Sequence, residues 1–202
     1  MTFHPRTAAR PLLASLRALL VLTAITGVAY PLLVTGVAQG AFHDRANGSM
    51  AEADGRKVGS RLIGQNWLDA AGEPDPRWFQ PRPSHSAHDP LATGSGQLGA
   101  SDPTLLATVR ETREQVAAFN DVPLDAVPPD AVTGSGSAVD PHISPAYARL
   151  QAARVAGANG LRPAEVARLV EEHTEGRDLG FLGNERVNVL ELNLALRALT
   201  AG

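Results

Sequence analysis

The stretch that decides the fold is ALLVLTAITGVAYPLLVTGVAQGAF, residues 18–42, which contains no charged side chain. A helix needs roughly 20 mostly apolar residues to cross the hydrocarbon core of a bilayer, and this stretch exceeds that length. It therefore predicts one transmembrane helix near the beginning of the chain, relative to which all other residues have to be placed.

Basic residues on either side of this stretch predict its orientation. The arginines before it are Arg6, Arg10 and Arg17, whereas the basic residues just after it lie among acidic ones. Lys and Arg close to a span favour the cytoplasmic side. We therefore expect residues 1–17 to be a cytoplasmic leader, residues 18–42 the transmembrane helix, and residues 43–202 a soluble extracytoplasmic domain of a single-pass protein in the cell membrane.

A cleaved signal peptide is the alternative interpretation of the same stretch. Ala38-Gln39-Gly40 has small residues at the spacing that a signal peptidase accepts, and the arginines match a basic leader. The apolar region of a signal peptide is about 7–15 residues long, however. This stretch is longer and carries Tyr30-Pro31 in its second half, so an uncleaved anchor explains it better.

Small residues recur within the stretch at a spacing of four, Thr23 with Gly27 and Gly36 with Gly40. Such pairs allow the backbone of a second membrane helix to approach closely, although glycine is also common in membrane helices in general. We predict that Gly27, Pro31, Gly36 and Gly40 mark a face that packs against a partner helix.

The composition of the remaining chain limits its chemistry. Residues 43–202 are enough for one compact domain with a hydrophobic core. The absence of cysteine excludes disulfides, thiolate metal sites and a cysteine nucleophile. Three of the 18 basic residues and none of the 21 acidic ones precede the apolar stretch, so the rest carries a formal charge of −6. That charge repels nucleic acid and is compatible with cation-rich surroundings, and it also simply keeps a domain soluble.

Capping residues followed by proline predict where the later helices begin. Asp102 and Ser144 each stand before a proline, and Asn188 with Glu191 three residues on is a variant of the capping box. The predicted helices run from Pro103 to near Asn120, from Pro145 to about Ala158, from Pro163 to a C-cap at Gly176, and onward from Asn188.

The other segments of the domain predict short strands and an ordered loop. Alternation over residues 57–64 and the segment Ala131-Val132-Thr133 indicate two short strands. Residues 72–103 are rich in proline and glycine, which excludes long regular elements. A solvated linker is poor in aromatic residues, so Trp78 and Phe79 favour an ordered loop over a disordered one. The predicted fold class is α+β: an N-terminal transmembrane helix and a mostly helical domain with a small β-sheet.

The segment Thr93-Gly94-Ser95-Gly96-Gln97-Leu98-Gly99 is the candidate for nucleotide binding. Backbone N–H groups of a glycine-rich loop can hold phosphate, and the helix predicted from Pro103 would add its N-terminal dipole. The segment has no Gly-Lys-Ser/Thr of a Walker loop, and no strand precedes it as in a dinucleotide site. The candidate residues are Gly94, Ser95, Gly96 and Gln97.

No pattern of catalytic or metal-binding residues accompanies this segment. His85 and His88 lie in a proline-broken loop, where a shared metal-binding face is not assured. Asp140 and His142 have acid–base side chains, but Asp before Pro and Ser before Pro are ordinary turn and helix-start chemistry. We expect no catalytic centre, no metal and no tightly bound cofactor. A membrane-anchored extracytoplasmic enzyme or binding module that acts alone is the alternative from another class.

Six short segments, in this order and spacing, carry a resemblance that extends over nearly the whole chain. They are residues 27–33, 46–49, 63–66, 82–84, 140–145 and 187–196. The chain resembles the C subunit of the Kdp high-affinity potassium-transporting ATPase of bacteria and archaea. The resemblance implies an accessory subunit with one transmembrane helix, in contact with membrane lipid. Its implied partners are a channel-like potassium-binding subunit and a P-type ATP-hydrolysing subunit, with no nucleic acid.

The resemblance also implies a role as catalytic chaperone, raising the ATP affinity of the hydrolysing subunit. The glycine-rich segment looks like the family's Ser-Gly-Gly-Ser-Asn/Gln-Leu segment, in which Gln97 would contact the ribose or base of ATP. The chain departs from this pattern, because Thr93 replaces serine and His88-Asp89 replaces a Tyr-Asn pair.

The two sets of expectations conflict over ATP. ATP is cytoplasmic, whereas the arginines before Ala18 place Gln97 on the other side of the membrane. The charge pattern is the firmer guide, since the glycine-rich segment alone is unspecific. We therefore expect the outer domain to lie over the potassium entrance of the channel-like subunit, with the anchor helix bound to the membrane part. A role in ATP affinity is the second hypothesis.

Overall fold

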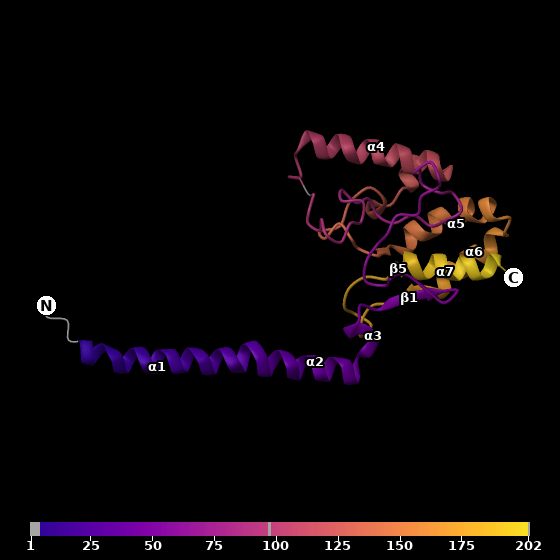
Figure 1. The fold of residues 1–202 in the computed structure, drawn as a ribbon. Coiled ribbons are helices and arrows are strands. Elements are labelled where there is room, and N and C mark those ends of the chain that lie inside the picture. Colours follow the sequence, from indigo (N-terminus) through magenta and orange to yellow (C-terminus); the bar gives the residue numbers. More distant parts are fainter. Residues whose placement is uncertain (1–4, 97, 202) are drawn as a thin grey trace. The chain divides into compact units, whose positions relative to one another are not determined.

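The computed structural model describes residues 5–96 and 98–201, with side chains from Ala9 onward. The chain divides into two compact units, Met1–Ser49 and Met50–Gly202 (Figure 1). Each unit has its own organisation, and the predicted α+β fold class is confirmed.

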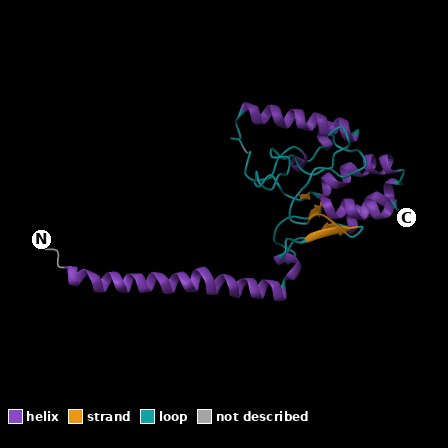
Figure 2. Cartoon of the chain, viewed as in Figure 1, coloured by secondary structure: helices purple, strands orange, loops and turns teal. Residues whose placement is uncertain are grey.

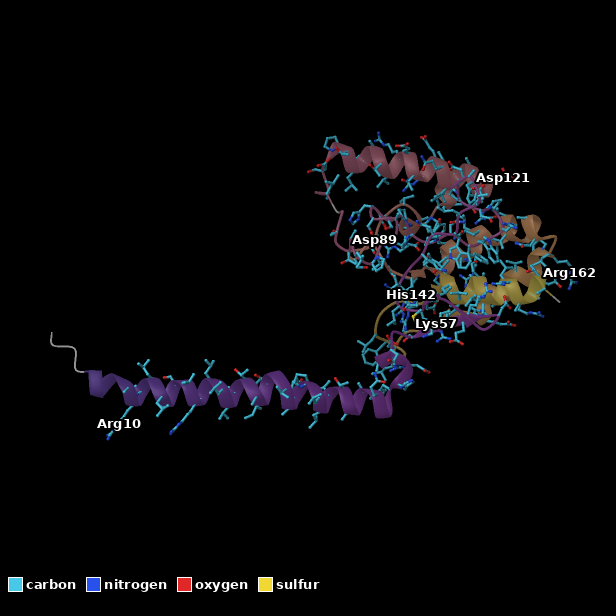
Figure 3. All side chains as sticks on the ribbon, in the orientation of Figure 1. Arg10, Lys57, Asp89, Asp121, His142 and Arg162 are labelled. Carbon is cyan, nitrogen blue, oxygen red and sulfur yellow. The ribbon has the colours of Figure 1, made fainter. Side chains whose placement is uncertain are left out.

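The first unit is dominated by a long apolar helix. It consists of α1 (Pro5–Ala24), the π-helical turn η1 (Ile25–Ala29) and α2 (Tyr30–Ala41), followed by the single turn α3 (His43–Ala46). Within the described chain, Ala9–Ala41 is the one segment long and apolar enough to cross a membrane, and none of its residues is buried (Figure 3). The helix begins well before residue 18, and the part of it that lies in the bilayer stays a prediction.

Pro31 explains the π-helical turn in this helix. Proline has no N–H to donate, and its ring clashes with the carbonyl four residues earlier, that of Gly27. The Tyr30 N–H correspondingly donates to the carbonyl of Ile25, five residues back. A π-turn of this kind accommodates a local irregularity without ending the helix, so Tyr30-Pro31 does not interrupt the apolar segment.

Two small antiparallel sheets belong to the second unit (Figure 2). Strands β1 (Met50–Ala53) and β2 (Arg56–Ser60) form a hairpin whose Asp54-Gly55 turn has positive φ at both residues, as a type I′ turn requires. The second sheet has the order β3-β5-β4, with β5 (Arg186–Asn188) between β3 (His142–Ile143) and β4 (Thr174–Glu175).

The described residues of the second unit contain four α-helices, which begin where the caps predict. They are α4 (Pro103–Asn120), α5 (Pro145–Asn159), α6 (Pro163–Glu172) and α7 (Val189–Thr200). The Asp102 carboxylate accepts the Thr104 N–H at 2.7 Å, and Ser144 Oγ accepts the Tyr147 N–H at 3.0 Å. Asn188 likewise caps α7, accepting the Glu191 N–H. The predicted helix starts are confirmed.

Three details of the predicted secondary structure are wrong. Helix α6 ends at Glu172, before Gly176, because the next residues pair with β5 as strand β4. Residues 131–133 do not form a strand, since Pro129–Ala131 is a 3₁₀ turn (η3) that follows another at Leu124–Ala126 (η2). The strand predicted over residues 57–64 ends at Ser60 and begins one residue earlier.

The hydrophobic core lies among α5, α6, α7 and β5, and it includes one ring from the proline-rich segment. The largest apolar side chains that are fully buried are Phe79, Val155, Val166, Val170, Val187, Leu192 and Leu196. The irregular chain between β2 and α4 is therefore anchored to the core through Phe79. This confirms an ordered loop rather than a disordered linker.

Two buried side-chain amides hold this segment in place. Asn193 on α7 accepts the Phe79 N–H at 2.9 Å and donates to the Phe79 carbonyl at 2.9 Å. Gln151 on α5 accepts the Gln80 N–H at 2.7 Å and donates to the Gln80 carbonyl at 3.1 Å. Both amides are fully buried. They supply the hydrogen bonds that a neighbouring strand would otherwise give to this irregular backbone.

Arg154 makes a third connection to the same segment. Its guanidinium donates to the carbonyls of Pro76 and Trp78 and to the side chain of Asn120, and it lies 4.3 Å from the centre of the Phe119 ring. Burial lowers the pKa of Arg154 to about 10, so the side chain stays charged at neutral pH. The loop, α4 and α5 are thereby joined through one side chain.

The substitution Asn193→Leu tests this arrangement. It leaves the N–H and the carbonyl of Phe79 buried without partners, at about 1–3 kcal/mol each, so the free energy of unfolding should fall by about 2–5 kcal/mol. Urea unfolding of the detergent-solubilised chain, followed by the fluorescence of Trp67 and Trp78, measures this. The control is Asn159→Ala, which removes a half-exposed amide that donates to the Arg77 carbonyl and should cost less than about 1 kcal/mol. Equal losses in the two variants would contradict the account.

Candidate functional site

The glycine-rich segment lies in irregular chain ahead of α4. The Gly94 N–H donates to the Ser137 carbonyl at 3.1 Å, and its φ of +148° is a conformation open to glycine. At Gly96 an added Cβ would lie 3.0 Å from the ring of His85. Ser95 is exposed, and Gln97 lies outside the described residues. The segment is shaped by contacts within the chain.

A side chain of the chain itself caps the N-terminus of α4. The carboxylate of Asp102 accepts the Thr104 N–H there. A phosphate placed there would meet this negative charge. The Gly94 N–H of the glycine-rich segment is likewise already donated, to the Ser137 carbonyl.

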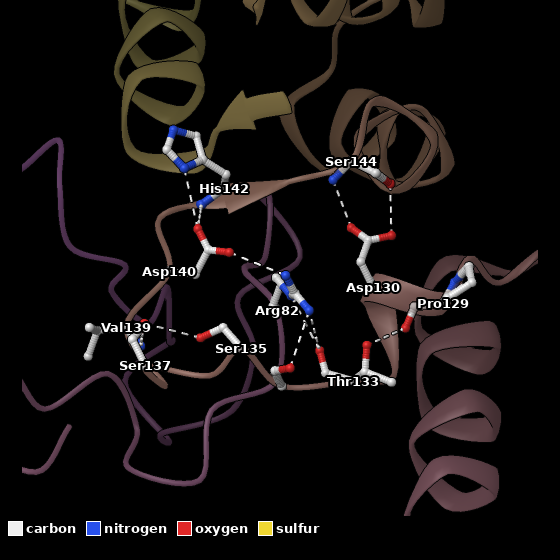
Figure 4. A network of polar contacts seen from close by, with 11 residues as sticks. Arg82, Pro129, Asp130, Thr133, Ser135, Ser137, Val139, Asp140, His142 and Ser144 are labelled. Atoms are coloured by element: carbon white, nitrogen blue, oxygen red, sulfur yellow. Dashed lines mark hydrogen bonds and ion pairs between the residues drawn. The ribbon is translucent and has the colours of Figure 1, made fainter. Parts of the chain in front are cut away.

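Arg82 lies at the centre of a polar network that joins two of the segments that carry the resemblance, residues 82–84 and 140–145, to the turn at residues 133–134 (Figure 4). Its guanidinium donates to Asp140 Oδ2 at 3.2 Å and to the carbonyls of Thr133 and Gly134 at 3.2 Å. Asp140 Oδ1 in turn accepts the N–H of His142 at 3.0 Å. One side chain thus joins the segment at 82–84 to the two turns before α5.

Asp140 is charged because its partners outweigh its burial. Burial alone would raise the pKa of this carboxyl group, but the hydrogen bonds and charge of His142 and the charge of Arg82 hold the pKa below its ordinary value. Asp130 is a second carboxylate in the same region, and it accepts both the N–H and the hydroxyl of Ser144, at 2.7 and 2.8 Å (Figure 4). Both carboxylates hold backbone in place, as the sequence pattern predicts for Asp140.

Gly64 and Asn66 bring a third segment to this region. The Gly64 N–H donates to the Val139 carbonyl at 2.8 Å, and an added Cβ would lie only 2.6 Å from the Asp140 carbonyl oxygen. Asn66 Oδ1 lies 2.9 Å from Nδ1 of the buried His88. The close approach to Asp140 explains why glycine stands at position 64. The contact with Asn66 holds the ring of His88 in place.

A cleft of about 680 Å³ lies beside these residues. Asn66, Arg82, His88, Gln115, Phe119 and Tyr147 are among the residues that line it. Tyr147 is 4% exposed, and burial raises its pKa to about 12. Its side chain is therefore neutral at physiological pH, as one of the groups that line the cleft.

The histidines do not form a metal centre in the part of the chain that the structure describes. His85 lies against Gly96, whereas His88 is paired with Asn66. No group of three or more His, Cys, Asp or Glu side chains among the described residues is arranged to hold a metal ion.

The glycines predicted to pack against a partner helix have open space around them. An added Cβ at Gly36 or Gly40 would meet no other atom within 4 Å, and at Gly27 it would make only an ordinary 3.8 Å contact with Thr23. Pro31 lies in the same helix just after the π-helical turn. Contacts within the chain therefore do not require glycine at any of the three positions.

Sequence reasoning missed the buried residues Tyr147, Gln151 and Asn193 and the half-buried Arg154. The signal was present, because each residue shares a helix face with apolar residues: Gln151 lies three residues after Ala148 and four before Val155, and Asn193 lies three residues from both Leu190 and Leu196. A polar residue on a buried helix face has to be hydrogen-bonded. The pattern alone does not identify the segment to which each of these residues is hydrogen-bonded.

The comparison with known families covers the apolar helix and the second unit together. Residues 12–198 match the family model described as KdpC: K+-transporting ATPase, c chain. This chain belongs to the KdpC family. The resemblance stated from the short segments is thereby confirmed.

Several curated KdpC relatives are similar over almost their whole length. The relative from Streptomyces coelicolor is 50% identical, covering 96% of this chain and 95% of its own. The relative from Kineococcus radiotolerans is 52% identical over 89% of both chains. The one from Mycobacterium tuberculosis is 49% identical, over 93% of this chain and 97% of its own. Each is named Potassium-transporting ATPase KdpC subunit.

His88 should make the stability of this KdpC chain depend on pH. Burial lowers the pKa of His88, and the charge of Asp140 only partly offsets this. Below about pH 6.5 the unfolded chain binds a proton that the folded chain does not. The free energy of unfolding should therefore fall as the pH drops from 7.5 to 5.5, by at most about 1.4 kcal/mol per pH unit from this group.

Urea unfolding at several pH values, followed by tryptophan fluorescence, measures the effect. His88→Gln should flatten the pH dependence between pH 7.5 and 5.5. His85→Gln, at an exposed histidine in the same loop, should leave it as in the wild type. An unchanged slope in His88→Gln would contradict the assignment.

Proposed function

We propose that this chain is the accessory subunit of a high-affinity, ATP-driven potassium uptake complex, needed to assemble and stabilise it. The observation that carries the proposal is the KdpC family match over residues 12–198, which includes the apolar helix as well as the domain. In this proposal the chain has no catalytic centre of its own. Its partners are the channel-like potassium-binding subunit and the P-type ATP-hydrolysing subunit.

The apolar helix is proposed to anchor the chain by binding a membrane helix of the channel-like subunit. Its surface is unburied, and Gly36 and Gly40 have room for a close neighbour. Small residues that let two backbones approach are the usual basis of packing between membrane helices. The remaining surface of the helix would contact lipid.

The second part of the proposal concerns orientation. Residues 1–17 are placed in the cytoplasm, residues 18–42 in the membrane, and residues 43–202 outside the cytoplasm over the potassium entrance. The arginines before residue 18 support this orientation. The net charge of −6 after the apolar stretch is compatible with a domain that lies where potassium enters.

A role as catalytic chaperone that raises the ATP affinity of the hydrolysing subunit is the alternative. It would involve Gly94, Ser95, Gly96 and Gln97, and it requires the second unit to be cytoplasmic. The family resemblance and the glycine conformation at Gly94 support it. The carboxylate of Asp102 at the start of α4 and the arginines before the span count against it.

Labelling of single cysteines separates the two orientations, because the chain has no cysteine of its own. A membrane-impermeant maleimide should label Ser101→Cys in intact cells with the outer barrier opened. It should label Thr7→Cys only after the membrane is permeabilised. The reverse result would contradict the proposed orientation, and Gln97→Ala would then be expected to weaken the apparent ATP affinity of the complex.

A further inference from the structure

The segment Arg177–Asn184, between β4 and β5, exposes large apolar side chains that take no part in the core. Leu179 is 83% exposed, Phe181 70% and Leu182 49%. The neighbouring strand residue Val187, by contrast, is fully buried. A cluster of exposed apolar side chains on a small domain commonly marks an interaction surface.

The backbone of this segment is a tight hydrogen-bonded turn. Asp178 and Leu182 exchange both backbone hydrogen bonds, each at 2.9 Å, and the Gly180 N–H donates to the Arg177 carbonyl. Leu179 has a φ of +53°, a conformation that side-chain-bearing residues adopt rarely and at a cost. The turn therefore holds its apolar side chains outward in a defined arrangement.

Ion pairs brace the base of the same turn. Arg186 on β5 pairs with Glu175 on β4 at 2.9 Å and with Asp178 at 3.5 Å. The two strands and the turn are thus joined through side chains as well as through the backbone. A surface that is ordered before binding loses little conformational entropy when it binds.

We propose that this turn inserts Phe181, flanked by Leu179 and Leu182, into an apolar pocket on the outer face of the channel-like potassium-binding subunit. The inference rests on the proposed function, which supplies the partner. A buried aromatic anchor surrounded by smaller apolar contacts is the usual form of a binding hot spot. Only residues 42–49 connect α2 to β1, so the second unit of an assembled complex stays within reach of the membrane-embedded subunits.

The charges around the turn favour a protein pocket over the bilayer surface. Segments that bind at the surface of a bilayer commonly carry Lys and Arg, which attract anionic lipid headgroups. Residues 175–186 carry three acidic and two basic side chains, and one of the basic side chains, Arg186, is already paired with carboxylates. The whole chain after the apolar stretch carries a charge of −6. An anionic lipid surface would repel this turn rather than attract it.

Co-purification from cells tests the inference on the whole complex. With an affinity tag on the potassium-binding subunit, Phe181→Ser should lower the amount of this chain that stays bound through repeated washing, because the loss of roughly 1.4 kcal/mol at a hot spot weakens the affinity about tenfold. Leu91→Ser is the matched control, because Leu91 is 95% exposed but lies outside the turn. Its recovery should equal that of the wild type, and both variants should keep the wild-type unfolding midpoint.

The outcomes distinguish this inference from the proposed function. Recovery of Phe181→Ser at the level of Leu91→Ser would overturn the inference and leave the proposed function in place. Failure of the wild-type chain to co-purify would refute the proposed function itself. In the reconstituted complex, Phe181→Trp adds a tryptophan whose fluorescence brominated phospholipids quench only on contact with lipid. No quenching of this added fluorescence is expected, and quenching would show that the turn binds lipid rather than a protein pocket.

Discussion

The second unit depends on the paired hydrogen bonds between two helix side chains and the backbone of Phe79 and Gln80. The segment between β2 and α4 has almost no regular structure, yet it enters the core at Phe79, which is fully buried. Buried backbone groups have to be paired, and prolines around this point prevent a long strand. Asn193 and Gln151 supply both donor and acceptor, so that the helices take the place of a strand.

The candidate site follows from this anchoring. Gln80 donates from its own side chain to the Trp67 and Asp75 carbonyls, which folds the preceding loop back on itself. Arg82 comes two residues later and reaches Asp140, so the position of Phe79 in the core determines where the polar network forms. The cleft beside Tyr147 has this irregular chain as one wall. The functional surfaces therefore lie on segments whose order comes from distant helices.

The sequence predicted the parts of the structure that depend on local chemistry. Asp102 and Ser144 cap their helices because capping requires only the next three residues, and the length of the apolar stretch needs no tertiary information. The partners of Gln151 and Asn193 lie 71 and 114 residues away, which no local pattern encodes. The strands of the second sheet have only two or three residues, too few for an alternation, and β4 explains why α6 ends before Gly176.

Hydrogen exchange of individual backbone amides tests the central claim most directly, because it reports on the Phe79 and Gln80 N–H groups themselves. If the side chains of Asn193 and Gln151 hold this segment, both amides should exchange as slowly as core amides of α5 and α7, although they lie in a proline-rich loop. Exchange as fast as that of the exposed loop residue Ala100 would contradict the account.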